Sequence, residues 1–299
     1  MTSTLRLDEI GLTGGNGVVW HFRDEFVHYN KVPIHLSNRN DHVIHCPSMS
    51  AGGYIHIQDW LNHGGDLFNR RYANKEDKIS PKTASKLSLK WKFYAGKDIS
   101  ATPAIYDDTI YFPCWNGNIY AVKKDDGKLV WKQNLNELTG LKATGFVMNV
   151  NTTVSRSTPT IAGNGLLIVG VFGPAIVLGL NRKNGKLVWL TYLDHHPAAL
   201  ITMSGTYYKG LVYKCCIFRG SMVKLNAFSG KIIWQTYMLP DNNGELGGYA
   251  GAAIWGSSPS IDAQRNNVYI ATGNLYSAPA RILECQERQD QMGPAARRV

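Results

Sequence analysis

Charged residues are scarce in this chain, and those present are scattered along it. Only 18% of its 299 residues are charged, whereas 44% are hydrophobic, and such a composition excludes an intrinsically disordered protein. The formal net charge is +10, but no run of five Lys or Arg and no recognisable nucleic-acid-binding motif occurs. We therefore interpret the charge as solvated surface and expect no nucleic-acid partner.

Cysteine motifs that would indicate common cofactors are also absent. The chain has five cysteines, and none forms a CxxC pair or a CxxCH sequence, so we expect neither a structural zinc site nor covalently bound haem. The glycine pattern of a Rossmann fold is missing as well, which argues against NAD. The N-terminal residues lack the basic region and apolar core of a signal peptide, and the sequence leaves the compartment undetermined.

No uninterrupted apolar run has the length of a membrane span. The longest uncharged stretch lies between Arg156 and Arg182, but several glycines and the pair Gly173-Pro174 interrupt it. Because Gly and Pro punctuate secondary structure, we predict two buried strands joined by a turn at Gly173-Pro174, and no membrane span.

An internal repeat is the strongest signal that the chain does contain. Its main element is a six-residue motif with Asp, Asn or Ser first, Gly second and Trp last, called the Gly–Trp motif below. A second motif, typified by Thr-Pro-Ala-Ile, precedes each copy at a nearly constant distance. The Gly–Trp motif occupies 126–131, 184–189 and 229–234, and the second motif occupies 102–105, 158–161 and 258–261, with a degenerate copy at 203–205.

Each repeat unit has the pattern of about four short strands. In the first unit, Thr109–Phe112 and Asn118–Val122 are rich in β-branched and aromatic residues and are separated by an Asn-Gly turn. The glycine of the Gly–Trp motif suits the positive φ of the next turn, and its Trp can pack between neighbouring sheets. We therefore predict an all-β chain of β-propeller blades, each a four-stranded antiparallel sheet.

These units resemble the blades, or PQQ repeats, of quinoprotein alcohol dehydrogenase-like β-propellers, and they look most like the polyvinyl-alcohol-dehydrogenase-like branch. Trp60–Tyr72 resembles the opening segment of that family, and Ile79–Pro81 and Leu87–Trp91 follow in the family's order. The stretches at 215–221, 247–251 and 255–260 also resemble this branch, so the resemblance spans roughly residues 59–289.

The resemblance implies a division of the chain into a poorly defined N-terminal segment (1–57), a partial propeller (58–289) and a tail (290–299). The sequence contains three complete units and the start of a fourth, which is an incomplete ring of about three to four blades. We therefore expect a fragment or a truncated gene product. An incomplete ring leaves sheet faces and edges exposed, so we also expect a partner that covers the open propeller edge.

The resemblance further implies a pyrroloquinoline quinone cofactor held over calcium near the propeller axis. Thr272–Asn274 resembles the family's metal-binding TGN sequence, so Asn274 is the expected metal ligand. Trp255 occupies the position of the aromatic residue beneath the quinone plane. The residues themselves leave two alternatives open: Asn274 ends a strand in a turn, and Trp255 packs between blades.

Cys215 and Cys216 are the second candidate cofactor contact, because quinoprotein dehydrogenases often carry a vicinal disulfide against the quinone. Adjacent cysteines alternate across a strand, so such a bridge requires a strained turn, and two reduced, partly buried thiols are the alternative. Relatives in this branch carry a longer acidic segment before the pair, whereas Lys209–Lys214 leads directly into it here. The expected metal carboxylate is missing, which argues against calcium and quinone binding.

The leading functional hypothesis is oxidation of a small or polymeric alcohol by a quinone-dependent dehydrogenase. No catalytic residue is named, because the family's general-base aspartate is expected beyond Val299. The alternative is a non-catalytic propeller that binds protein or polysaccharide, and the fold alone cannot choose between the two. The missing carboxylate favours the binding protein, whereas Trp255 and Asn274 favour the enzyme.

Overall fold

The computed structural model of the chain describes most of the repeat region. Apart from the strands at 35–36 and 43–49, the N-terminal segment lies outside the described residues, and so does the tail at 290–299. The described residues are 35–36, 43–49, 59–73, 76–141, 153–163, 165–196, 198–216, 218–240, 248–255 and 257–280.

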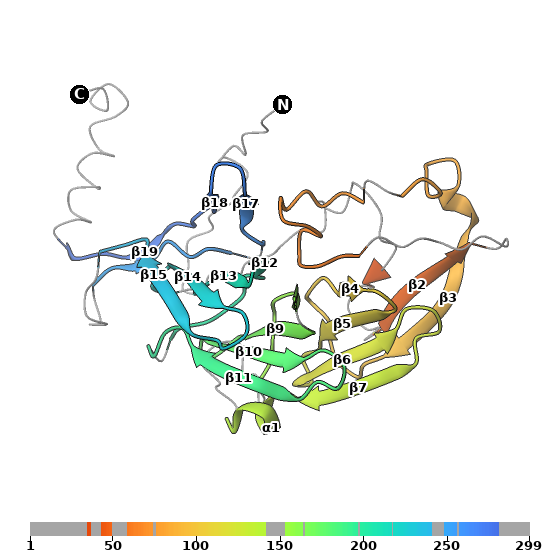
Figure 1. Cartoon of the computed structure of the whole chain (residues 1–299), viewed down its shortest axis with the longest axis horizontal. Helices are drawn as coiled ribbons and strands as arrows, with labels where there is room; N and C mark the ends of the chain where they lie inside the picture. The colour runs from red at the N-terminus through yellow and green to blue at the C-terminus, as the bar shows by residue number, and fades with distance from the viewer. Residues whose placement is uncertain are drawn as a thin grey trace.

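Three four-stranded antiparallel sheets form the body of the structure and confirm the predicted blades (Figure 1). The strands of each sheet follow in chain order, from an inner strand after the Thr-Pro motif to an outer strand that carries the Trp. The first sheet contains β4 (Ala104–Tyr106), β5 (Thr109–Pro113), β6 (Asn118–Lys123) and β7 (Leu129–Asn134), the second β8 (Thr160–Ala162), β9 (Leu166–Val171), β10 (Ile176–Asn181) and β11 (Leu187–Tyr192), and the third β12 (Thr206–Tyr208), β13 (Leu211–Cys216), β14 (Ser221–Asn226) and β15 (Ile232–Tyr237).

Smaller sheets flank these three blades. A three-stranded sheet precedes them, and two of its strands come from the N-terminal segment that carries no repeat motif. After the third blade, one hairpin and one further strand pair are formed. The flanking strands are β1 (His35–Leu36), β2 (Val43–Met49), β3 (Leu87–Tyr94), β16 (Ala250–Gly251), β17 (Ser260–Asp262), β18 (Asn267–Tyr269) and β19 (Leu275–Ser277), and the described helices are a short 3₁₀ helix (Ala84–Lys86) and α1 (Leu135–Thr139).

The uncharged stretch folds as the sequence predicts. Strands β9 and β10 are almost wholly buried and pair antiparallel on either side of Gly173-Pro174. Among the described residues, no helix has the length and apolar character needed to cross a membrane.

The glycines of the Gly–Trp motif shape the turn before each outer strand. Gly127, Gly185 and Gly230 have φ values of 71°, 71° and 70°, a left-handed conformation that residues with a Cβ adopt only with strain. The N–H of each glycine donates to the carbonyl four residues earlier. Just after each turn, the pairing between the outer strand and its neighbour shifts register by one residue beside the Trp. Such a bulge increases the local twist of an edge strand.

The same motif joins each sheet to the next. The glycine leaves room for the tryptophan of the preceding sheet, because a Cβ at any of the three positions would lie within 2.8 Å of that indole ring. The three indoles are each 8% exposed. The indole N–H groups of Trp91, Trp131 and Trp189 donate, respectively, to the carbonyl oxygens of Lys124, Arg182 and Ala227, each at 2.9 Å.

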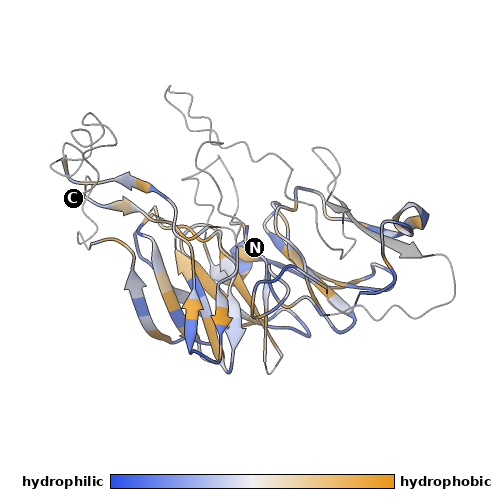
Figure 2. Ribbon diagram, turned by 90° about the horizontal axis from the view of Figure 1, so that it is seen from above, coloured by the Kyte–Doolittle hydropathy of each residue, from blue (hydrophilic) through white to orange (hydrophobic). Residues whose placement is uncertain are grey.

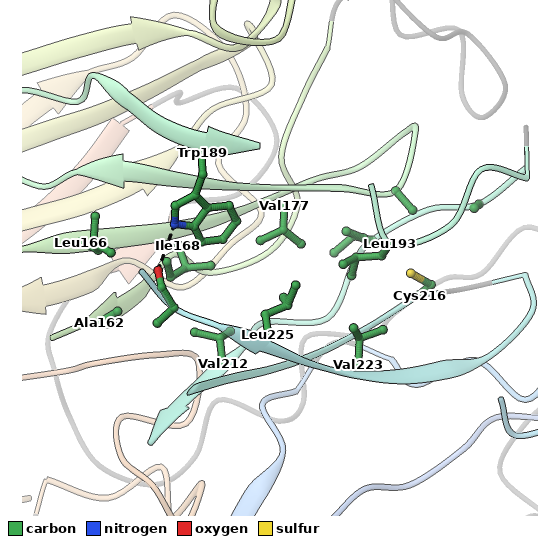
Figure 3. Close-up of a cluster of buried hydrophobic side chains, with 14 residues drawn as sticks. Ala162, Leu166, Ile168, Val177, Trp189, Leu193, Val212, Cys216, Val223 and Leu225 are labelled. Atoms are coloured by element: carbon green, nitrogen blue, oxygen red, sulfur yellow. Dashed lines mark hydrogen bonds between the residues drawn. The ribbon is translucent and has the colours of Figure 1, made fainter. Parts of the chain in front are cut away.

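Apolar side chains fill the space between successive sheets. Hydrophobic residues concentrate within the strands, and hydrophilic residues mark many of the turns (Figure 2). Between the second and third blades, Ile168 and Trp189 meet Val212, Val223 and Leu225 (Figure 3). Replacing one such buried large side chain by Ala costs about 3–5 kcal/mol, so inter-sheet packing is a principal source of the stability of this stack.

The opening segment, residues 60–71, lies along the inner strands, and we call it the axial segment. The inner strands β4, β8, β12 and β17 contact one another in succession, and the axial segment contacts all four of them. Trp60 and Ile105 exchange two backbone hydrogen bonds of 2.8 Å each. The backbone N–H groups of Ile161 and Ile261 donate to the carbonyl oxygens of Leu61 (2.8 Å) and Leu67 (2.9 Å). The side-chain Nδ2 of Asn62 donates to Thr206 Oγ1 at 3.4 Å.

Candidate functional site

The candidate site lies where the loop after β15 meets the turn between β13 and β14. The N–H of Gly251 donates to Phe218 O at 2.6 Å, and the N–H of Gly220 donates to Gly251 O at 2.9 Å. The close approach of these two backbone segments requires glycine at position 220, because a Cβ at Gly220 would collide with the carbonyl of Ala252. The loop that carries Trp255 is therefore fixed to the third blade by backbone contacts.

The structure brings Trp255 and Asn274 together. The N–H of Ala252 donates to Asn274 O at 2.9 Å, and the N–H of Gly273 donates to Ala253 O at 2.7 Å, so the two segments run side by side. The indole of Trp255 lies against Gly273, where a Cβ would be 2.9 Å from its Nε1. Trp255 is nevertheless 45% exposed, which distinguishes it from the buried inter-sheet tryptophans and leaves ring surface open to a ligand.

Asn274 is exposed, and of its side-chain atoms only the amide nitrogen has a partner among the described residues. Nδ2 donates to the carbonyl of Leu275 at 3.0 Å. Its Oδ1 accepts no bond from any described residue and is available as one neutral oxygen ligand.

Cys215 and Cys216 are free, buried thiols in a regular part of β13. They pair with Met222 and Ser221 of β14 in unbroken register, which places their side chains on opposite faces of the sheet. Cys215 faces the candidate site, because its thiol donates to the carbonyl of Ile254 at 3.8 Å.

The other thiol belongs to the packing between blades. Cys216 lies in the core between the second and third blades, and burial raises its pKa to about 12. It is therefore a neutral packing residue. Of the two thiols, only Cys215 is placed to contact a ligand held near Trp255.

The described residues do not fit a calcium ion. Calcium requires six to eight oxygens, usually with carboxylates among them. Within the described residues, no three His, Cys, Asp or Glu side chains are grouped closely enough to hold a metal ion. Asn274 alone offers one uncharged oxygen. We therefore derive no chemical step through a metal.

A buried ion pair near this site was not evident from the sequence. Arg219, in the β13–β14 turn, donates from Nη2 to Asp194 Oδ1 at 2.8 Å and from Nε to Oδ2 at 3.2 Å. The carboxylate is fully buried and also accepts the N–H of His196 at 2.9 Å. The two partners are 25 residues apart in different loops, so no spacing rule could have paired them. The carboxylate of Asp194 is thus held by its partners and is not free to act as a base.

A partly buried histidine lies on the axial segment. His63 Nδ1 lies 3.4 Å from the hydroxyls of both Thr102 and Thr158, which are equivalent residues of two repeats. Burial, with a smaller effect of Arg71, lowers the pKa of His63 to about 4. The imidazole is therefore neutral at neutral pH, and the hydroxyls fix its position.

The axial segment also contacts the loop that carries Trp255. Nδ2 of Asn69 and Nη2 of Arg71 donate to the Ser257 hydroxyl oxygen at 2.7 and 2.8 Å. The site thus combines three parts of the chain: the axial segment, the third blade and the loop after it. Only the last two carried residues that the sequence had predicted as cofactor or metal contacts.

The third blade contains a second buried cation. Lys214, next to Cys215, is 1% exposed, and its Nζ donates to the carbonyl of Met203 at 2.8 Å. Burial lowers its pKa to about 7. It points away from Cys215, toward Gly170 of the second blade, where a Cβ would lie 2.7 Å from its Cε. It therefore belongs to the packing between blades.

A family model and individual proteins match the chain. The model described as outer membrane protein assembly factor BamB matches residues 83–282. A polyvinylalcohol dehydrogenase from a Pseudomonas species is 26% identical over 243 residues, which cover 73% of this chain and 36% of that protein. A BamB from Moranella endobia is 26% identical over 188 residues, covering 58% of this chain and 45% of that protein.

The fold comparison agrees with the repeat pattern. The crystal structure of the quinohemoprotein alcohol dehydrogenase from Comamonas testosteroni superposes with a TM-score of 0.59 at 20% identity, covering 73% of this chain and 36% of that one. A sequence identity of 20% shows that the two chains share a fold and nothing more specific. The chain spans about a third of the length of the dehydrogenases that it matches.

Proposed function

This chain belongs to the family described as outer membrane protein assembly factor BamB, and we propose that it forms the quinone-contacting blades of a quinoprotein-type alcohol dehydrogenase. The observation that carries the proposal is the exposed indole of Trp255, held against Gly273 beside Asn274. A flat aromatic ring with an open face suits a planar cofactor, because offset stacking of two rings is favourable. The names of some dehydrogenase relatives, quinohemoprotein alcohol dehydrogenase and alcohol dehydrogenase (quinone), support the same class of cofactor.

In this proposal each residue of the site has a separate binding role. Trp255 supplies the stacking surface, Asn274 presents its free Oδ1 at the edge of that surface, and Cys215 packs behind the loop through Ile254. The axial segment holds the loop in place through Ser257. These contacts order the site before a ligand arrives, which lowers the entropy cost of binding.

The quinone, when bound, is the acceptor of the two electrons that an alcohol loses. A base that removes the alcohol proton is also needed, and the described residues offer none at this site. The one buried carboxylate beside it, Asp194, is paired with Arg219. The proposal therefore assigns cofactor binding to this chain and the base to further blades. A small or polymeric alcohol is the proposed substrate of the complete assembly.

Titration of the full chain with pyrroloquinoline quinone in a calorimeter tests this proposal. We expect saturable binding that Trp255→Ala weakens about tenfold, because stacking residues of this kind are binding hot spots. Trp234→Ala is the matched control, since it removes an indole that is 36% exposed on a different strand, and it leaves the affinity unchanged. Equal loss in both variants, or no binding at all, contradicts the proposal.

A non-catalytic binding protein is the second candidate function, and one observation favours it. The described residues contain no group of three or more His, Cys, Asp or Glu side chains that could hold a metal ion, and a calcium-supported redox centre without carboxylates is unusual. A relative named as an assembly factor, BamB from Moranella endobia, matches over more of its own length than the dehydrogenases do. If the folded chain fails to bind the quinone, this second function becomes the preferred one.

A further inference from the structure

The loop after β11 holds a histidine ring in one orientation. His196 Nδ1 accepts the N–H of Ala198 at 3.1 Å, and the backbone N–H of His196 donates to Asp194 Oδ1 at 2.9 Å. The ring of His196 stacks on the ring of Phe218, with the centroids 4.3 Å apart and 21° between the planes. Two hydrogen bonds and one ring contact therefore fix a side chain that is only half-buried.

The hydrogen bond from Ala198 also determines the tautomer of this ring. In a neutral imidazole, one nitrogen accepts a hydrogen bond and the other nitrogen carries the proton. Burial is the largest influence on His196 and lowers its pKa below 6.5, an effect that Asp194 opposes and Arg219 reinforces. The ring is therefore neutral at neutral pH. Because its Nδ1 is the acceptor, the proton lies on Nε2.

The donor at Nε2 has no acceptor among the described residues. The two ring nitrogens point to different sides of the imidazole, so Nε2–H is directed away from the backbone that holds Nδ1. A fixed, half-buried donor without a protein partner has lost part of its hydration and has gained no bond in exchange. A ligand that supplies the acceptor would restore that balance.

Phe218 connects this ring to the candidate site. Its carbonyl accepts the N–H of Gly251 at 2.6 Å, in the loop that carries Trp255. The φ of Phe218 is 81° and that of Ala252 is 48°, left-handed values that residues with a Cβ adopt only with strain. Strain of this kind collects at ligand sites, where the surrounding structure maintains it. The turn that supports the His196 ring is thus the turn to which the Trp255 loop is fixed.

We propose that His196 is a further ligand-binding residue of this site and that its Nε2–H donates to an oxygen at the edge of the bound quinone. The inference rests on the proposed function. Pyrroloquinoline quinone carries carbonyl and carboxylate oxygens around a flat ring system, and a fixed donor and a stacking surface suit these two features.

The contact from His196 adds direction to the stacking contact. Stacking on Trp255 alone leaves the quinone free to turn in its own plane, because the two ring faces have no preferred rotation strong enough to fix it. A hydrogen bond is directional, so a donor held in one orientation removes this freedom. The small number of precisely placed polar groups in a ligand site fixes orientation in this way.

Calorimetric titration of the full chain with pyrroloquinoline quinone tests the inference. His196→Phe keeps a ring that can stack on Phe218 but lacks the donor, and we expect the affinity to fall about fivefold or more, as for the loss of one hydrogen bond. His196→Gln places an amide N–H near the position of Nε2 and should recover most of the affinity. His195→Phe is the matched control: His195 is exposed and stacks on Tyr192, and its replacement should leave the affinity unchanged.

Nitrogen NMR separates ligand binding from structural support. The chain has nine His residues, and His196→Gln assigns the ring of His196 in a long-range proton–nitrogen spectrum. We expect the Nε2–H tautomer in the free chain. On titration with the quinone we expect a saturable shift of the Nε2 resonance of His196, while the resonances of His195 stay unchanged. A ring that only supports the loop would not show this difference.

The outcomes distinguish this inference from the proposed function on which it rests. If the wild-type chain does not bind the quinone, both fail. If it binds, equal affinity of a folded His196→Phe variant, or an Nε2 resonance of His196 that does not shift, overturns the inference alone. Equal losses in His196→Phe and His196→Gln would assign the effect to the lost bond with Ala198 and would also overturn it. Thermal unfolding shows whether each variant is folded.

Discussion

Trp189 donates its indole N–H to the carbonyl oxygen of Ala227 in the next sheet, 2.9 Å away (Figure 3), and its ring covers Gly230. This contact combines a hydrogen bond, a large buried ring and a glycine with φ of 70°. Because the same arrangement recurs between each pair of complete sheets, it should account for much of the stability of the stack.

Replacing the turn glycine tests that expectation. We expect Gly230→Ala to lower the free energy of unfolding by about 3 kcal/mol, through left-handed strain and overpacking against Trp189. Gly165→Ala is the matched control, because its φ is 77° and nothing lies within 4 Å of the added Cβ. It should cost about 1 kcal/mol. Urea denaturation measures both, and equal costs would show that the contact with Trp189 contributes little.

The buried ion pair beside the candidate site should matter more than any surface pair. Asp194→Asn leaves the guanidinium of Arg219 without its charged partner, and we expect a loss of about 3 kcal/mol of stability. Asp262→Asn is the control, since its partner Arg265 is 70% exposed and such pairs contribute little. Thermal and urea unfolding of both variants give the comparison. A small effect at Asp194 would mean that this pair contributes little to the stability of the chain.

The neutral His63 makes stability depend on pH. Burial lowers its pKa from 6.5 to about 4 in the folded chain, so the unfolded chain binds more protons between these values. The stability contributed by neutral His63 is complete above pH 6.5 and falls by about 3 kcal/mol as the pH drops to 4. His63→Gln should flatten this part of the profile, measured by urea unfolding at a series of pH values. An unchanged slope in the variant would show that His63 is not the group responsible.

Quinone binding without turnover is the expected functional behaviour of this chain. After incubation with pyrroloquinoline quinone and Ca²⁺, we expect little or no dye-linked oxidation of primary or secondary alcohols. The physical reason is that Asn274 offers one neutral oxygen and the described residues contain no group of three or more His, Cys, Asp or Glu side chains that could hold the ion. Robust turnover that disappears with Asn274→Ala would contradict this expectation and would show that the site is complete.

Local sequence patterns predicted the blades because each blade is built from local contacts. The turn glycines and the interrupted stretch around Gly173-Pro174 act within a few residues of their own positions. The Trp of each outer strand was found because its motif repeats along the chain. The proximity of Trp255 and Asn274 was also expected, because the resemblance placed both residues in one pocket. Their backbones indeed run side by side.

Contacts between distant segments could not be predicted in this way. The axial segment carries no repeated sequence motif, and its hydrogen bonds reach residues in four different inner strands. The pairing of Asp194 with Arg219 depends on how two loops meet after the sheets have stacked. The orientation of Cys215 toward Ile254 follows from the register of β13, which a pair of adjacent cysteines does not reveal.

Fluorine NMR of the chain labelled with 5-fluorotryptophan is the most direct test of the quinone site. The chain has eight Trp residues, and Trp255→Phe assigns the resonance of Trp255. On titration with pyrroloquinoline quinone, we predict a saturable shift of this resonance, with Trp131 and Trp189 unaffected in the core. A resonance of Trp255 that stays unchanged at saturating quinone, or a shift confined to other tryptophans, would contradict the assignment of this site.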